Sequence, residues 1–519
     1  MSFAALRALH ASIGSAIDDL ERIYTDRSQS EPLDFPRLDE PYYATASHSA
    51  TEELAHSLND DPAVSLASKK IVAACGHLAA SVNKPWYGLM EAIQAGQLSA
   101  AIRFLEAAHI VEILREAGPQ GLHVKDIHRS VVELRPKTAP APDPETFTVA
   151  RLGHVLRLLA TSHWLKEVGP DVFANNRRSS YIDTGKSLEQ LRAKPDKKYL
   201  DTDGVAAFVG LTGDEAFKFM AYMTEWFLPD TRTGSLVLDA KGGFDSAKSG
   251  TPSEVAKDSD SAPVKYVCPF NLAFDTQLGF FPWLELPENR GRLERFGHAM
   301  TGTRQWETKE GILFGFPWAE LPPDSVLVDV GGGIGSTSLT VAVAHPHVNV
   351  VVEDRPQVVE LAPSSWGPKY ASLFETGRIS FRVRDLFEPW KPLASEKAPD
   401  VFLIRLVLHD WMDPDCLNML RILRSAAGPN TKLLIGDMLL PFACDSEDAF
   451  IKEDSPLLPN LGTANIHGYL IDIMMMGMFG AKERTVAEMT ELTRAAGWKI
   501  TDIRRSSGSL WAYTTAVPI

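Results

Sequence analysis

The chain has 519 residues, of which 45% are hydrophobic, and its formal net charge is −15 at pH 7. This length exceeds the size at which a single hydrophobic core keeps growing, so at least two domains are expected. The acidic balance argues against nucleic acids and anionic membranes as partners, because both bind mainly through clustered Lys and Arg. A small molecule is the expected partner.

Neither a membrane span nor a secretory signal is predicted. No apolar run reaches the roughly 20 residues that a spanning helix needs, and Asp18, Asp19 and Glu21 follow soon after the first apolar residues. The four cysteines are isolated, which is typical of a reducing compartment and gives no metal-ligand spacing. We therefore expect a cytoplasmic protein without a metal site.

An amphipathic helix is expected at the N-terminus, because apolar residues recur at every third or fourth position. These residues are Leu6, Leu9, Ile13, Ile17, Leu20 and Ile23. The apolar stripe packs either in the intramolecular core, which we favour, or against a second copy of the chain. Residues 28–62 are rich in Ser, Pro, Asp and Glu, and indicate an extended connector.

Helical patterns follow the connector and end in a short hairpin. Apolar elements are expected at 102–114 and 149–159, and residues 164–173 predict a hairpin around Gly169-Pro170-Asp171. Helices followed by a hairpin indicate a winged-helix shape. Such a shape also occurs in DNA-binding regulators, but the acidic balance favours a structural or dimerising use.

Composition divides the chain into three expected parts. Residues 233–263 are poor in apolar residues and predict a long surface insertion. A Pro-rich linker at 317–324 closes the helical region. The expected parts are an N-terminal helix and connector at 1–62, a helical dimerisation and substrate domain at 63–322 with an insertion at about 185–265, and a catalytic domain at 323–519.

Beyond residue 322, apolar strand candidates alternate with helices, which predicts a doubly wound α/β sheet. The strand candidates are 326–330, 348–352, 379–383, 401–408 and 432–435. Two further strands, 498–503 and 510–515, are separated by a turn too short for a parallel crossover. These two are expected to be antiparallel neighbours at one edge of the sheet.

The first strand candidate leads into a glycine-rich turn that contains Gly331, Gly333 and Gly335. Glycines there let the backbone approach a ligand that a Cβ would obstruct. The dinucleotide fingerprint is G-x-G-x-x-G. Counted from Gly331, its last glycine falls at position 336, where this chain has Ser336. Asp329 precedes the turn and can pair with an ammonium group. The turn alone therefore favours S-adenosylmethionine, with NAD still a competitor.

Acidic or ionisable residues follow the strand candidates, and ligands of doubly wound sheets bind at the carboxyl ends of strands. Asp354 can accept both ribose hydroxyls of an adenosine, or can cap the helix that starts at Pro356. Asp385 can accept from an adenine amino group while Leu386 and Phe387 pack on the ring.

His409 is the catalytic candidate, because imidazole takes and returns a proton near neutral pH. Asp437 follows the neighbouring strand candidate, so its carboxylate is expected to orient the ring and stabilise imidazolium. Glu483 is either a second such carboxylate or an exposed acid at the start of a helix.

Seven segments together resemble one enzyme family. They are FPWLE (281–285), RFGHAM (295–300), VDVGGGIG (328–335), DRPQV (354–358), RDLF (384–387), LHDW (408–411) and KERT (482–485). This ordered set is similar to that of S-adenosylmethionine-dependent O-methyltransferases of the plant caffeate type and their fungal relatives. The resemblance covers roughly residues 101–182 and 269–519, and the longer N-terminal regions look more like a fungal branch of secondary metabolism.

The resemblance implies a Rossmann-like doubly wound sheet with an antiparallel edge strand, preceded by a mostly helical winged-helix domain that forms a homodimer. It implies that His409, Asp437 and Glu483 are catalytic and that S-adenosylmethionine is the cofactor. The implied cofactor residues are Asp329, Gly331, Gly333, Gly335, Asp354, Arg355, Asp385, Leu386, Phe387 and Arg405. The implied acceptor residues are Phe274, Met300, Ile473, Met474 and Met478.

Two departures from the family pattern bear on the site, the first on the contact with His409 and the second on the acceptor pocket. Asp437 stands where the plant enzymes usually have Glu, and Met478 falls near a position that often holds Asn. Thioethers adapt to flat apolar ligands, so the Met-rich stretch suits an aromatic hydroxyl, although it also fits a core helix. The expected reaction is O-methylation of a phenolic or aromatic hydroxyl. The alternative is a methyltransferase-like pericyclase or dehydratase acting on a polyketide-type metabolite.

Overall fold

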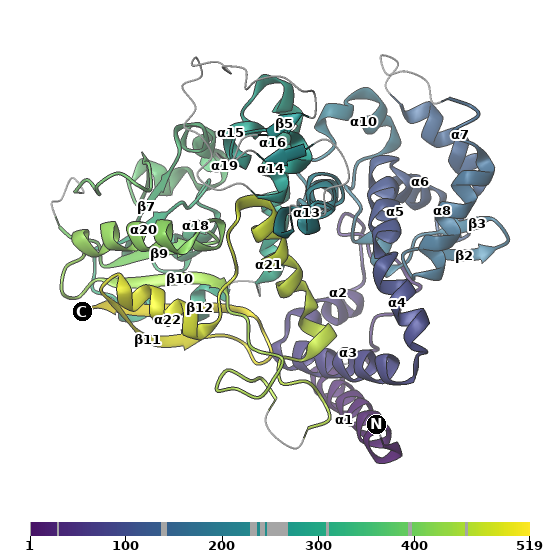
Figure 1. Ribbon diagram of the computed structural model, residues 1–519, viewed down its shortest axis with the longest axis horizontal. Coiled ribbons are helices and arrows are strands. Elements are labelled where there is room, and N and C mark those ends of the chain that lie inside the picture. Colours follow the sequence, from purple (N-terminus) through teal and green to yellow (C-terminus); the bar gives the residue numbers. More distant parts are fainter. Residues whose placement is uncertain are drawn as a thin grey trace. The chain divides into compact units, whose positions relative to one another are not determined.

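The computed structural model describes residues 2–28, 31–135, 143–228, 236–238, 244–246, 268–307, 311–392, 397–451 and 455–519. The chain divides into two compact units (Figure 1). Unit 1 comprises residues 1–20, 60–81 and 307–519, and unit 2 comprises residues 21–59 and 82–306.

Unit 1 contains a seven-stranded sheet in the order β11-β12-β10-β9-β6-β7-β8. The strands are β6 (Ser325–Val330), β7 (Val348–Asp354), β8 (Ile379–Val383), β9 (Val401–Arg405), β10 (Lys432–Met438), β11 (Trp498–Arg504) and β12 (Trp511–Pro518). β12 is antiparallel to both of its neighbours, and the other pairs are parallel. The doubly wound sheet and the antiparallel pair of last strands are therefore confirmed.

The central strands are apolar along their length because helices cover them. In β9, the residues Val401 to Ile404 are all fully buried, as expected for a parallel strand with both faces covered. Cys416, Met419 and Leu420 on α20 pack in the same core cluster. The helices of this region are α17 (Gly311–Gly315), α18 (Ser336–Ala344), α19 (Pro356–Glu375), α20 (Asp413–Ala426), α21 (Ile466–Phe479) and α22 (Val486–Ala495).

The fourth strand is shorter than expected. The sequence predicts a strand over 401–408, but β9 ends at Arg405. Leu406 has a left-handed backbone with φ 52°, and a 3₁₀ turn, Leu408–Asp410, follows. An L-residue in this region cannot continue the strand. His409 therefore lies on a tight turn beyond the strand.

The N-terminal helices contribute to unit 1. Leu9 on α1 (Phe3–Arg27) and Ala73 and Ala74 on α3 (Pro62–Val82) form a buried cluster with Leu457 and Leu461. The intramolecular packing favoured for the N-terminal stripe is confirmed for Leu9, which is 1% exposed, while Ile17 is 49% exposed. The chain segment between β10 and α21 thus packs on helices from the other end of the sequence.

Unit 2 is mostly helical. Its helices are α2 (Ala50–Ser57), α4 (Pro85–Ile93), α5 (Ala95–Ala107), α6 (Ile110–Ala117), α7 (Val124–Leu134), α8 (Val149–Thr161), α9 (Arg177–Ser180), α10 (Leu188–Ala193), α11 (Val205–Leu211), α12 (Phe217–Met220), α13 (Met223–Phe227), α14 (Pro269–Phe274), α15 (Phe280–Leu284) and α16 (Arg290–Gly302). The expected hairpin is present as β2 (Lys166–Gly169) and β3 (Val172–Ala174), and β1 (Leu122–His123) pairs with β3.

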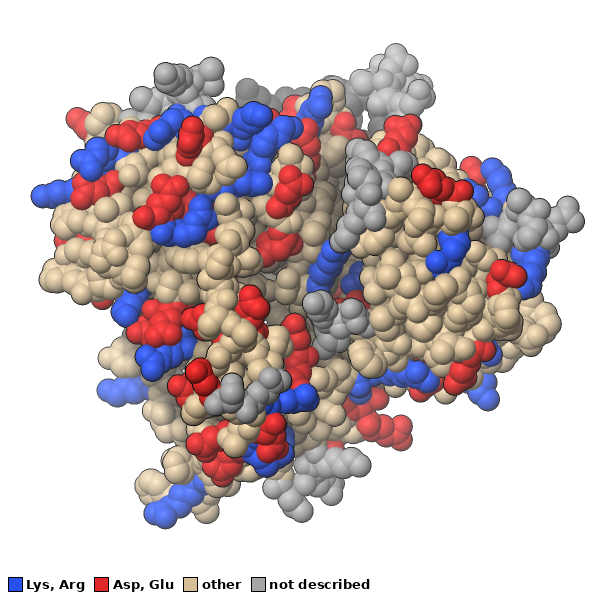
Figure 2. Space-filling view, turned by 180° about the vertical axis from the view of Figure 1, so that it is seen from behind, with Lys and Arg blue, Asp and Glu red and all other residues tan. Residues whose placement is uncertain are grey.

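The expected insertion at 233–263 lies outside the described residues, except for the strand pair β4 (Leu236–Leu238) and β5 (Phe244–Ser246). The domain limits at 62 and 322 stay a prediction. In the part of the chain that the structure describes, no helix has the length and apolarity to cross a membrane. Acidic and basic side chains are interspersed on the face shown in Figure 2.

Candidate active site

The glycine-rich turn follows β6 and is shaped by left-handed backbone. Gly331, Gly333 and Gly335 have φ values of 70°, 61° and 80°. A Cβ at Gly331 would lie 2.8 Å from Cγ2 of Val407, whereas a Cβ at Gly333 would meet no atom within 4 Å. The turn is therefore packed at Gly331 and open at Gly333. This open backbone fits a ligand that approaches closely.

Asp329 lies beneath this turn. It is fully buried, and the Ser338 hydroxyl donates to its Oδ2. A Cβ at Gly332 would clash with the Asp329 carboxyl group. Burial raises the pKa of Asp329 to about 6, against the lowering effect of the Ser338 hydrogen bond. The carboxyl group thus supports the turn from the protein side.

Asp354 ends β7 and is tied to the same turn. Its Oδ2 accepts from the Gly333 backbone N–H at 2.8 Å, and its Oδ1 accepts from the Arg355 N–H at 2.7 Å. Burial raises the pKa of Asp354, and these two hydrogen bonds oppose the shift. The residue before α19 is Arg355, so the helix-cap interpretation of Asp354 is wrong. The carboxylate is held at the open side of the glycine turn.

His409 is buried at 6% exposure and has a carboxylate beside each ring nitrogen. Its Nδ1 lies 2.7 Å from Oε1 of Glu483, and its Nε2 lies 3.4 Å from Oδ1 of Asp410. Burial alone would lower the pKa of His409, but the charges of Glu483 and Asp410 raise it to about 10. Burial raises the pKa of Asp410 to about 6, and His409 opposes this shift.

Glu483 makes the hydrogen bond that the sequence assigns to Asp437. Strands β9 and β10 are parallel neighbours as expected, but Oδ1 of Asp437 accepts from the Leu406 N–H at 3.1 Å. Burial raises the pKa of Asp437 to about 7, with the nearby His409 opposing the shift. The interpretation of Glu483 as an exposed acid is wrong, because this residue is 4% exposed. Asp437 acts on His409 by its charge at longer range.

Arg484 anchors the turn that carries His409, and sequence reasoning missed this role. It is 2% exposed and donates to the carbonyl oxygens of Leu408 at 2.8 Å and Trp411 at 3.0 Å, and to Oδ1 of Asp413 at 2.9 Å. Asp410 was also missed as a neighbour of His409. Arg484 follows Glu483 and Asp410 follows His409 in the sequence, and these positions could have pointed to both residues.

Arg405 is paired with protein groups at the end of β9. Its Nη2 lies 2.8 Å from Oε2 of Glu307, and its guanidinium lies 4.7 Å from the ring centroid of Trp511. The Tyr513 hydroxyl donates to the other Glu307 oxygen at 2.5 Å. The charges of Glu307 and Tyr513 raise the pKa of Arg405 despite its burial. The predicted cofactor role of Arg405 stays a prediction.

The third strand is followed by a turn that is stabilised by Asp385. Its Oδ1 accepts from the Phe387 N–H at 2.9 Å. Leu386 and Phe387 pack against the core cluster, and the Phe387 ring lies edge-on to Trp411 with centroids 4.8 Å apart. The Phe387 ring thus lies on the turn that follows His409.

The predicted acceptor residues are divided between the units. Phe274 on α14 and Met300 on α16 belong to unit 2, and Ile473, Met474 and Met478 lie on α21 in unit 1. Met474 and Met478 are buried at 8% and 3% exposure. The role of all five in acceptor binding stays a prediction.

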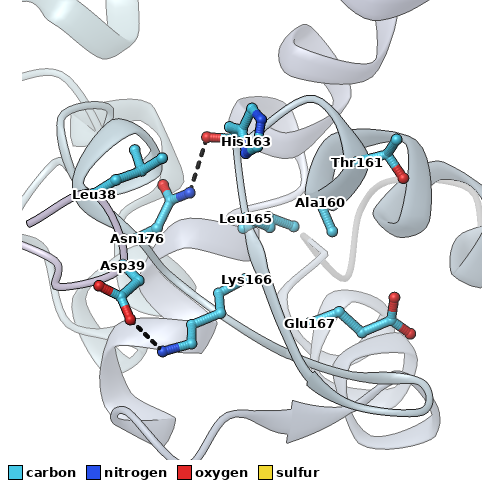
Figure 3. A pocket seen from close by; sticks show the side chains of 9 residues that line it. All are labelled: Leu38, Asp39, Ala160, Thr161, His163, Leu165, Lys166, Glu167 and Asn176. Atoms are coloured by element: carbon cyan, nitrogen blue, oxygen red, sulfur yellow. Dashed lines mark hydrogen bonds and ion pairs between the residues drawn. The ribbon is translucent and has the colours of Figure 1, made fainter.

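A pocket of about 380 Å³ lies within unit 2 (Figure 3). Its wall includes the ion pair between Lys166 and Asp39 at 2.9 Å, and the Asn176 side chain donates to the His163 carbonyl nearby. None of its lining residues belongs to the predicted site.

Comparison with known proteins agrees with the motif set. Residues 296–499 match the model of the O-methyltransferase domain family. The chain is 33% identical to an O-methyltransferase of Armillaria gallica over 99% of this chain and 100% of that one. It is 31% identical to 4-O-methyltransferase 1 of Phanerochaete chrysosporium over 96% of both chains.

Solved structures share the fold. The mitomycin 7-O-methyltransferase structure has a TM-score of 0.57 at 20% identity and covers 83% of this chain and 97% of its own. The structure titled as LepI in complex with SAM has a TM-score of 0.61 at 16% identity and covers 91% of this chain and 100% of its own. Because the chain is similar to the Armillaria enzyme over its full length and matches the family model, it belongs to the S-adenosylmethionine-dependent O-methyltransferase family and uses S-adenosylmethionine as its cofactor.

Proposed function

We propose that this enzyme methylates a phenolic or other aromatic hydroxyl of a small molecule, with His409 as the general base. The observation that carries the proposal is the His409–Glu483 hydrogen bond of 2.7 Å, buried beyond the carboxyl end of β9. The carboxylate on Nδ1 holds the ring, and Nε2, which lies 3.4 Å from Oδ1 of Asp410, is the nitrogen that we propose takes the proton of the acceptor hydroxyl. When it is ionised, the nearby Asp437 carboxylate also raises the pKa of His409 and so stabilises imidazolium.

The residues around the glycine turn fit the cofactor. The backbone at Gly333 is open, and Asp354 is held beside it as an acceptor for ribose hydroxyls. Asp385, Leu386 and Phe387 follow the third strand, where an adenine ring is expected. When bound, S-adenosylmethionine supplies an activated sulfonium methyl group. The protein then has to align the acceptor oxygen and exclude water.

His409 has to lose a proton before it can act as a base. With a pKa of about 10, its imidazole is protonated at neutral pH. We propose that binding of the positively charged cofactor lowers the pKa of His409, because a nearby positive charge disfavours imidazolium. A phenol has a reference pKa of ~10, so removal of its proton by a neutral imidazole helps the oxygen to attack at neutral pH.

We also propose a homodimer that forms through unit 2. The α7–α8 pair with the β2–β3 hairpin has the element order of a winged helix, and exposed apolar side chains gather on α4. Trp86, Tyr87 and Ile93 are 61%, 54% and 63% exposed. Sedimentation of the purified chain tests this proposal, and a monomer at micromolar concentration would contradict it.

Incubation with methyl-labelled S-adenosylmethionine and a panel of phenol, catechol, 2-naphthol and hydroxybenzoate esters tests the proposed reaction. The expected result is a labelled methyl ether with release of S-adenosylhomocysteine. Tight cofactor binding without any labelled ether across the panel would contradict it.

A pericyclic reaction or dehydration is the second candidate. The chain shares its fold with a structure titled as a pericyclic reaction enzyme, with a TM-score of 0.61. Such chemistry needs no transfer of the methyl group. Turnover of a polyketide-type substrate that continues with S-adenosylhomocysteine in place of S-adenosylmethionine would favour this candidate over methylation.

A further inference from the structure

Arg405, the last residue of β9, lies level with the glycine-rich turn. In the parallel register of β6 and β9, Val330 pairs with Ile404. The next residues, Gly331 and Arg405, are therefore neighbours at the carboxyl edge of the sheet. Burial raises the pKa of Asp329 beneath the turn, and the charge of Arg405 is among the effects that oppose this shift. A guanidinium group at this place can bind a ligand carboxylate through two parallel hydrogen bonds.

One edge of this guanidinium is already paired with a carboxylate of the protein. Nε and Nη2 of Arg405 both donate to Oε2 of Glu307, at 3.2 Å and 2.8 Å. The Tyr513 hydroxyl donates to the other oxygen, Oε1, at 2.5 Å. Both oxygens of Glu307 therefore have a donor, and Glu307 covers the two donors that a ligand carboxylate would use.

The sheet fixes the two groups that hold Glu307. Gly436 on β10 pairs with Arg405 on one side and with Tyr513 on the other. A Cβ at Gly436 would lie 3.1 Å from Cγ of Arg405 and 2.9 Å from Cε1 of Tyr513. Because Gly436 has no side chain, the guanidinium and the phenol can meet at one carboxylate.

The ion pair is largely buried, with side-chain exposures of 14% for Arg405 and 9% for Glu307. A buried charge without a counter-ion is costly, so Arg405 needs an anionic partner. A ligand carboxylate supplies the same charge and the same kind of acceptor as Glu307 does. The two carboxylates therefore compete for one guanidinium.

We propose that Glu307 takes the place of the cofactor carboxylate on Arg405 in the enzyme without cofactor, and has to leave Arg405 when the amino-acid end of S-adenosylmethionine binds there. Glu307 thereby lowers the affinity for the cofactor, because only the fraction of enzyme with a released Arg405 can bind this carboxylate. The inference rests on the proposed placement of the cofactor at the glycine turn and on the predicted cofactor role of Arg405. It does not depend on the acceptor or on His409.

Titration calorimetry of the full chain with two ligands tests this competition. S-adenosylhomocysteine carries the amino-acid carboxylate, whereas 5′-methylthioadenosine has the adenosine and the sulfur but no amino-acid group. Glu307→Gln removes the competing charge and keeps an oxygen for the Tyr513 hydroxyl. We expect this variant to bind S-adenosylhomocysteine at least about fivefold more tightly than the wild type, with an unchanged affinity for 5′-methylthioadenosine.

Two further variants test the contacts of Glu307 separately. Arg405→Met should weaken the binding of S-adenosylhomocysteine only, and adding Glu307→Gln to it should bring no gain. Tyr513→Phe removes the donor to Oε1 but leaves both charges, so it should give a smaller gain than Glu307→Gln.

Asp400→Asn is the matched control for the change of charge. Asp400 precedes β9 at the opposite end of the strand from Arg405, and its Oδ2 accepts from the Val326 N–H at 2.9 Å. This variant loses the same charge as Glu307→Gln and should keep the wild-type affinity for both ligands.

Three outcomes for Glu307→Gln would overturn the proposal. A weaker binding of S-adenosylhomocysteine would mean that Glu307 itself binds the cofactor. Unchanged affinities with a lower free energy of unfolding would give the ion pair a structural role only. An equal gain for both ligands would show that Glu307 does not compete with the carboxylate. Failure of the cofactor placement is distinct, because it would leave the affinity of Gly333→Ala for S-adenosylhomocysteine unchanged.

Discussion

A different carboxylate lies beside each ring nitrogen of His409. Glu483 at Nδ1 is at hydrogen-bond distance, while Asp410 at Nε2 is farther away, at 3.4 Å. In the proposed mechanism, the hydrogen bond at Nδ1 fixes the ring and Nε2 takes the proton of the acceptor. The sequence points to His409 as the candidate base, and this role stays a prediction. It cannot choose between Asp437 and Glu483 as the hydrogen-bond partner of the ring, because the choice depends on contacts between distant segments.

Replacement of Glu483 by Gln should shift the pH dependence of activity. In the enzyme without cofactor, whose pKa values kcat/KM for S-adenosylmethionine reports, the pKa of His409 is raised to about 10, so the neutral base forms only as pH rises toward that value. Glu483→Gln removes the largest charge that raises this pKa while keeping an oxygen near Nδ1. The ascending limb of kcat/KM should therefore move to lower pH by more than one unit, with a lower plateau because the base is weaker.

The measurement is a kcat/KM profile between pH 5 and pH 10.5 for both proteins. Asp437→Asn serves as the comparison, because it removes a more distant charge and should cause a smaller shift in the same direction. An unmoved limb in Glu483→Gln would show that His409 does not control the profile.

At the scale of the elements, the positions of the strands could be predicted from the sequence, but the end of β9 could not. The parallel strands are buried apolar runs, which the sequence displays directly. The end of β9 depends on Leu406 in a left-handed conformation without a glycine to signal it. The packing of α1 and α3 in unit 1 could likewise not be predicted from the sequence, because it joins residues more than 380 positions apart.

At the glycine turn, Gly333→Ala should affect cofactor binding more than folding. The left-handed backbone costs Ala about 1–2 kcal/mol, but the new methyl group would meet no protein atom within 4 Å. It would instead occupy the open side of the turn. We expect an affinity loss of at least roughly tenfold for S-adenosylhomocysteine, measured by titration calorimetry.

Gly377→Ala is the matched control for this change. Gly377 has φ 68°, its Cβ would also meet no atom within 4 Å, and it lies between α19 and β8. The control should lose similar unfolding free energy and keep the wild-type affinity. Equal affinities of all three proteins would contradict the placement of the cofactor at Gly333.

At the scale of the whole molecule, most of α1 and of α3 belongs to the compact unit that contains the seven-stranded sheet. Leu9 lies in one buried cluster with Leu457 and Leu461, ahead of helix α21. Leu9→Ala should therefore lower the free energy of unfolding by about 2–5 kcal/mol, the usual range for a buried leucine. Ile17→Ala changes a residue that is 49% exposed on the same helix and should cost much less.

Urea unfolding followed by tryptophan fluorescence measures both variants. Equal stability of Leu9→Ala and Ile17→Ala would mean that α1 does not contribute to the unit as described.

The central claim is that His409 takes the acceptor proton during methyl transfer. Wild type and His409→Asn are compared for transfer of labelled methyl from S-adenosylmethionine to the best phenol, with cofactor affinity measured in parallel. We predict that His409→Asn keeps the affinity and loses about 10²- to 10⁴-fold in kcat, as for a positioned general base. Methyl transfer by His409→Asn within a few-fold of the wild-type rate would contradict the claim.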